Sequence, residues 1–97
     1  MMILAEWLEE RMDEALAAFG ASRPAALAMV LGELRGALIA RDGNSDEVFT
    51  AIDRLGDAEK AAMRGRLGDA RGSFDAAADC IDKLIREGAA QRPTAAA

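Results

Sequence analysis

The stretch MRGRLGDARGSFDAAADCIDKL, residues 63–84, carries the most regular pattern in the chain. Its apolar residues recur at alternating spacings of four and three, which places them along one side of an α-helix as a heptad seam. This seam predicts one long helix over residues 58–87, with its apolar side packed against other helices. The seam consists of Met63, Leu67, Ala70, Phe74, Ala77, Ile81 and Leu84.

The rest of the chain is also helical in pattern, and no stretch alternates convincingly between apolar and polar residues as a strand does. Short turns rich in glycine separate the patterns, so we expect neighbouring helices to be antiparallel. The prediction is an all-α domain over residues 1–88, a small bundle of three to four helices, followed by a disordered, flexible tail at 89–97. The three helices before the last are expected at 3–19, 23–41 and 45–55.

Two copies of the pentapeptide RLGDA, at 54–58 and 66–70, bear on where the third and fourth helices end and begin. We interpret the first copy as a helix end at Gly56 followed by a new start at Asp57. The second copy offers the same signals and could break the last helix at Gly68. Because the seam keeps its phase across this copy, we predict a continuous helix.

The apolar content is unusually rich in alanine. Of the 50 residues counted as hydrophobic, 23 are alanine, which leaves 27 larger side chains for a chain of 97 residues. So few large side chains form a sufficient core only if the helices approach closely through alanine, or if a second chain covers what remains exposed. We therefore expect a homodimer, formed through the small residues of the second helix or through the seam. The residues assigned to this contact are Ala28, Gly32, Gly36, Ile39, Leu67, Phe74 and Ile81.

Composition argues against several classes of chemistry. The chain has no histidine, no tyrosine and a single cysteine, so it lacks the usual general base, a disulfide framework and the ligands of a typical zinc site. Seventeen acidic and twelve basic residues give a net charge of −5, which disfavours a large phosphate-binding surface. We expect a protein that is not an enzyme, with no catalytic residues, cofactor or bound metal.

The first helix divides into an apolar side and an acidic side. Its acids stand four residues apart and repel one another, whereas residues 71–86 place acids four residues from bases, as at Arg71–Asp75 and Asp82–Arg86. Trp7 and Arg11 lie one turn apart and belong to the residue types enriched at binding hot spots. The alternative is a solvated acidic face, with Trp7 covering the core. The expected partner-binding residues are Glu6, Trp7, Glu10, Arg11, Asp13 and Glu14.

These features favour a non-catalytic protein–protein interaction module, an inhibitor, adaptor or chaperone of a larger assembly, whose partner presents a basic surface. One alternative is an acidic inhibitor, of the immunity or anti-defence type, that occludes a basic nucleic-acid-binding site on its target. A second alternative is a helix-turn-helix transcriptional regulator. We disfavour direct binding of nucleic acid, because Asp46 and Glu47 would meet the phosphates at the start of the recognition helix.

Nothing in the sequence predicts a membrane segment. The most apolar stretch, residues 25–40, is too short for a span of about 20 residues and carries Glu33 and Arg35. The first residues turn acidic at Glu6 without a basic flank, so we do not expect a secretory signal there. The lone Cys80 fits a reducing compartment, and the expected location is the cytoplasm.

Overall fold

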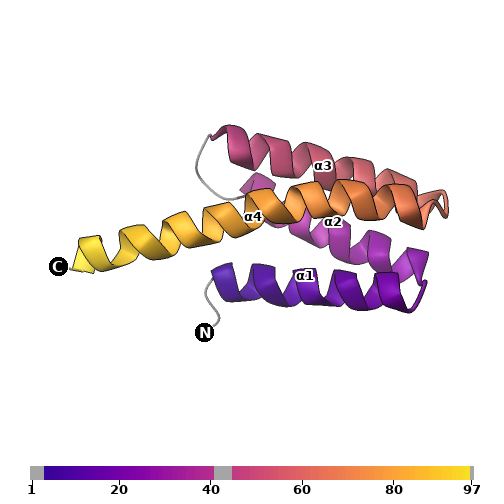
Figure 1. The fold of residues 1–97 in the computed structure, drawn as a ribbon, viewed down its shortest axis with the longest axis horizontal. Helices are drawn as coiled ribbons and strands as arrows, with labels where there is room; N and C mark the ends of the chain where they lie inside the picture. The colour runs from indigo at the N-terminus through magenta and orange to yellow at the C-terminus, as the bar shows by residue number, and fades with distance from the viewer. Residues whose placement is uncertain (1–3, 41–44, 97) are drawn as a thin grey trace.

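The computed structural model describes residues 4–40 and 45–96, with side chains as far as Glu87, and these residues form an antiparallel bundle of α-helices (Figure 1). α1 packs on α2, α2 on α3 and α3 on α4, while α4 returns to α1 with a much shorter contact. The predicted all-α bundle is confirmed. The helices are α1 (Leu4–Gly20), α2 (Pro24–Ala40), α3 (Asp46–Met63) and α4 (Leu67–Ala96).

The core is packed mainly with leucine and alanine side chains. The large side chains that are fully buried include Leu27, Leu34 and Phe74, and alanines without exposed surface lie between them. An alanine on a helix surface keeps neighbouring backbones close, so a few large side chains suffice to fill the interior at ordinary packing density. Within residues 4–40 and 45–87, no polar or charged residue is buried. The alanines with no exposed surface are Ala15, Ala51, Ala58, Ala70 and Ala77.

The predicted seam lies inside one chain and not between two copies. Phe74 and Ile81 are buried in the core, and Leu67 packs against the core at the start of α4. Phe74 and Ile81 are covered by their own bundle, so their assignment to a dimer contact is corrected, whereas Leu67 is only partly buried. Met63, the first residue of the predicted seam, is 74% exposed at the end of α3.

The boundary between the third and fourth helices differs from the prediction. α3 passes through Gly56 and ends at Met63, and α4 begins at Leu67. The break is a Schellman motif, in which Gly65 takes a left-handed φ of 74°. The Gly65 amide donates to the Ala62 carbonyl at 3.0 Å, and the Arg66 amide donates to the Ala61 carbonyl at 2.8 Å. The predicted helix end at Gly56 and the continuous helix over 58–87 are therefore both wrong.

Two alanine substitutions of opposite sign test this boundary. An added Cβ meets open space at Gly65 and at Gly72, so only the backbone conformation distinguishes them. We expect Gly65→Ala to lower the free energy of unfolding by about 1 kcal/mol, because an L-residue is strained at positive φ. We expect Gly72→Ala to raise it by about 0.5–1 kcal/mol, because Gly72 lies inside α4. Urea unfolding measures both, and a stabilising Gly65→Ala would indicate one uninterrupted helix.

α4 is joined to the start of α3 by a side-chain contact. Ser45 caps α3, its hydroxyl accepting a hydrogen bond from the Val48 amide at 3.3 Å. Glu47, in the first turn, accepts a hydrogen bond from Lys83 of α4 at 2.8 Å. The hydrogen bond and the opposite charges lower the pKa of Glu47 and raise the pKa of Lys83. This exposed ion pair links α4 to the start of α3, at the end of the bundle away from Gly65.

The C-terminal part of α4 extends beyond the residues whose side chains are described. The helix continues to Ala96, whereas a tail without regular structure is expected from residue 89. Side chains are described only as far as Glu87, so the flexibility of residues 89–97 stays a prediction. No described helix is both long enough and apolar enough to cross a lipid bilayer.

Candidate functional site

Among the described side chains, four of the five acids of α1 form an exposed, unpaired sector of its surface, and the fifth, Glu14, pairs with Arg11. Glu6, Glu9, Glu10 and Asp13 are all exposed, and none has an ion-pair partner among the described side chains. At 100° per residue they cover the side of α1 that faces away from the core, and Glu9 and Asp13 lie at its edge toward α4. The exposed acidic face of the prediction is therefore present, and part of it borders a second helix.

A groove of about 420 Å³ runs between α1 and α4, where the contact between neighbouring helices is shortest. Its floor is apolar, and acids from both helices form its walls. A single base, Arg71, lies among the lining residues. The floor residues are Met12, Leu16, Phe74 and Ala78, and the wall residues are Glu9, Asp13, Asp75 and Asp82.

The floor of the groove is firmly held by the core beneath it. The ring centroids of Phe19 and Phe74 lie 5.4 Å apart and the ring planes are inclined by 53°, a tilted arrangement that aromatic pairs favour. Phe74 and Met12 are buried, whereas Leu16 remains 41% exposed. The groove thus presents a large apolar side chain, Leu16, to solvent above buried residues of the core.

The charged residues that line the groove are predominantly acidic. The guanidinium of Arg71 lies 5.5 Å from the centre of the Phe19 ring and pairs with Asp75 at 2.8 Å, so its charge is already matched. Glu9, Asp13 and Asp82 have no ion-pair partner among the described side chains. Four acids and one base give the lining a net charge of −3. Like charges that face each other across the groove repel, and a bound cation would relieve that repulsion.

Trp7 and Arg11 contact each other, and they lie where α1 packs on α2. The Arg11 guanidinium lies 5.7 Å from the Trp7 ring centre and pairs with Glu14 at 2.7 Å and with Glu33 of α2 at 3.7 Å. Both Trp7 and Arg11 are half-buried. Of the six predicted partner-binding residues, Trp7, Arg11 and Glu14 are therefore engaged within the chain. The other three, Glu6, Glu10 and Asp13, are exposed and available.

Sequence reasoning missed the half of the groove that α4 contributes. Asp75 and Asp82 resemble ordinary members of a solvated face, and Phe74 and Ala78 resemble core positions. Only the arrangement of the helices brings these residues opposite Glu9 and Asp13. The repulsion among the acids of α1 is the one signal in the sequence that points to this side of the molecule.

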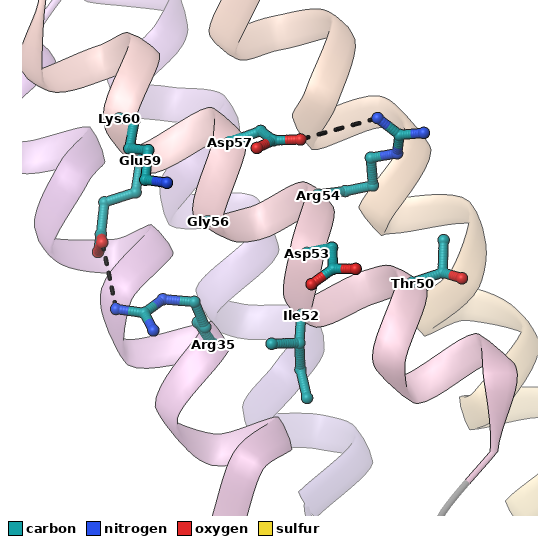
Figure 2. A pocket seen from close by; sticks show the side chains of 9 residues that line it. All are labelled: Arg35, Thr50, Ile52, Asp53, Arg54, Gly56, Asp57, Glu59 and Lys60. Carbon is teal, nitrogen blue, oxygen red and sulfur yellow. Dashed lines mark hydrogen bonds and ion pairs between the residues drawn. The ribbon is translucent and has the colours of Figure 1, made fainter.

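A second hollow, of about 610 Å³, lies over α2 and α3 (Figure 2). Its lining contains three bases and three acids, and it is therefore neutral. Arg35 of α2 pairs with Glu59 of α3 at 3.3 Å, and Arg54 pairs with Asp57 at 3.7 Å (Figure 2). Four of the six charges in this lining are paired within the chain and the total is neutral, so the hollow is a weaker candidate for a charged ligand than the groove.

No described group of three histidine, cysteine or carboxylate side chains is placed to hold a metal ion. The acids of the groove are spread over two helices, Glu9 and Asp13 on α1 and Asp75 and Asp82 on α4, a distribution that suits a ligand with several separated positive charges. The thiol of Cys80 is free and half-buried. No protein-family model, curated protein or solved structure matches the chain.

Proposed function

We propose that this chain is a non-catalytic protein-binding module whose α1–α4 groove receives a basic amphipathic helix of another protein. One observation carries the proposal: an apolar floor lies between two walls of carboxylates, three of them without a described ion-pair partner. A helix with an apolar stripe flanked by lysine or arginine has the complementary pattern. Its apolar stripe would cover Leu16, and its basic flanks would reach Asp13 on one wall and Asp82 on the other.

The charges and the apolar floor contribute differently to such binding. Exposed carboxylates attract a basic partner from a distance and set its orientation, which mainly raises the association rate. Apolar contacts on the floor slow dissociation, because they remove Leu16 and the partner's apolar stripe from water. Binding to this groove is therefore expected to weaken with salt without being abolished.

A second copy of this chain is a poor occupant of the groove. Two copies related by a twofold axis would bring the same acids together, and the like charges would oppose association. The expectation of self-association therefore requires another surface, and the expectation of a basic partner remains attached to the groove.

Charge reversal on either side of α1 tests the proposal. The probe is a fluorescently labelled peptide of about 18 residues, about 27 Å long when helical, with a leucine stripe flanked by lysines. We expect the double variant Glu9→Lys/Asp13→Lys to weaken its binding by about tenfold to hundredfold, because two attractions become repulsions. The matched control, Glu6→Lys/Glu10→Lys, also changes the net charge from −5 to −1 but lies outside the groove. Its loss is expected to be several-fold smaller.

The same experiment separates the alternatives. Equal losses in the two double variants would contradict the groove and favour the acidic inhibitor, whose whole acidic sector would cover a basic nucleic-acid-binding site. Binding that collapses between about 50 and 300 mM salt would point the same way. Retention of the protein on DNA would favour the transcriptional regulator and contradict the proposal.

A further inference from the structure

Four of the exposed large apolar side chains lie on α2 and α3, away from the α1–α4 groove. Met29 is 69% exposed and Ile39 57% exposed on α2, while Phe49 is 53% exposed and Met63 74% exposed on α3. On each helix, these residues belong to a stripe with spacings of three and four, the period of one helix side. The stripes are Met29, Gly32, Gly36 and Ile39 on α2, and Phe49, Ile52, Gly56, Glu59 and Met63 on α3.

The two stripes lie side by side and form one surface. A Cβ added to Gly32 would stand 2.7 Å from Oε2 of Glu59, and a Cβ added to Gly56 would stand 3.8 Å from Cδ of Arg35. The Arg35–Glu59 ion pair crosses between the helices at the middle of this surface (Figure 2). Because α2 and α3 are antiparallel, Met29 and Met63 lie toward one end, and Ile39 and Phe49 lie toward the other.

We propose that a second copy of this chain docks on this surface, the α2–α3 face, defined by Met29, Gly36, Ile39, Phe49 and Met63 around the Arg35–Glu59 pair. A twofold contact brings the same patch together from both copies, so the patch must be complementary to itself. Both ends of this face are apolar, so a twofold contact would bring apolar residues of one copy onto apolar residues of the other. At the centre, Arg35 of each copy would lie near Glu59 of the other, so that opposite charges meet.

The charge distribution selects this face for a copy of the same chain. The chain carries a net charge of −5, and the α1 acids and the groove concentrate negative charge on the opposite side of the bundle. α2 carries only two charged residues from Pro24 to Ala40, Glu33 and Arg35. A copy that approaches through the α2–α3 face therefore keeps the two acidic surfaces as far apart as the bundle allows.

The composition and shape of the face also fit a protein interface. Methionine and aromatic residues are enriched in interfaces, and Met29, Phe49 and Met63 of this face belong to those types. An added Cβ at Gly36 meets nothing within 4 Å, so another helix can approach the α2 backbone closely there. Gly36 and Ile39 thus remain candidates from the predicted contact. Gly32 is covered by Glu59, and Ala28 packs against the core of its own chain.

Molar mass in solution tests the proposal. We expect the full chain, at about 100 µM, to have twice the 10.2 kDa mass of one chain by light scattering after size-exclusion chromatography. Met29→Lys and Ile39→Lys should each raise the dimer dissociation constant by about hundredfold, because each buries an unpaired charge at the contact. Both positions are exposed in one chain, and circular dichroism verifies that each variant folds.

Leu4→Lys is the matched control, because it makes the same chemical change at an exposed leucine of α1. Its dissociation constant should equal that of the native chain. A native chain that remains monomeric up to about 500 µM would overturn the proposal. The proposal would also be overturned if Met29→Lys and Ile39→Lys left the native dimer intact. The same holds if Leu4→Lys weakened the dimer as much as those two substitutions do, because the contact would then lie elsewhere.

Discussion

Phe74→Ala is expected to lower the free energy of unfolding by about 3–5 kcal/mol, the range found when a buried phenylalanine is truncated and leaves a cavity. Phe74 is 2% exposed and touches Phe19 across the junction of α1 and α4. A domain of this size has a total stability of about 5–15 kcal/mol. The substitution therefore removes a large part of that stability, and a measurable fraction of the chain should be unfolded at 37 °C.

Urea unfolding followed by circular dichroism measures this loss, and Phe49→Ala is the matched control. Phe49 loses the same atoms from a side chain that is 53% exposed, so we expect a cost below about 1 kcal/mol. Both variants are compared at about 1 µM protein, where self-association contributes least to the apparent stability. Equal losses would show that Phe74 does not lie in the core, and they would also remove the floor of the groove.

The sequence identifies the helices because periodicity reports burial directly. α1 and α2 lie within one residue of the predicted ranges, and the residues that α2 buries are large apolar ones. The end of α3 could not be found in this way, because the apolar residues before and after Gly65 keep the same phase. Gly56 lies inside α3, where an added Cβ would make only an ordinary van der Waals contact with Arg35, so this glycine does not mark a helix end.

The candidate site was less predictable than the fold, because it depends on which helices are neighbours. The acids of α1 follow from the sequence, but their position opposite Asp75 and Asp82 does not. Local spacing predicts the Arg71–Asp75 pair, and the structure confirms it. By contrast, Lys83 pairs with Glu47, 36 residues away, which no local rule indicates.

The two proposed surfaces are compatible in one assembly. Because the helices pack in the circular order α1, α2, α3, α4, the α2–α3 face lies opposite the α1–α4 groove. A dimer through the α2–α3 face would therefore leave both grooves open and directed away from the contact. Such a dimer could hold two basic helices, and a target that carries both would bind more tightly than a target with one.

Ala58→Leu is expected to lower the free energy of unfolding by about 1–3 kcal/mol, because a leucine overfills a tightly packed core. The substitution tests whether contacts through alanine complete that core. Ala58 has no exposed surface and faces the core from α3. A leucine side chain there must displace neighbouring residues or separate the helices. The same substitution at Ala17, which is exposed on α1, adds the same atoms in solvent and should change the stability by less than about 0.5 kcal/mol.

Urea unfolding of both variants at about 1 µM protein distinguishes two ways of completing a core that has few large side chains. If alanine lets the helices approach closely, Ala58→Leu destabilises a single chain and Ala17→Leu does not. If the helices were instead loosely packed until a second chain covered them, an extra side chain at Ala58 would fill space and stabilise the protein. The absence of exposed surface at Ala58, and at Ala51 and Ala77 in the same core, favours the first result.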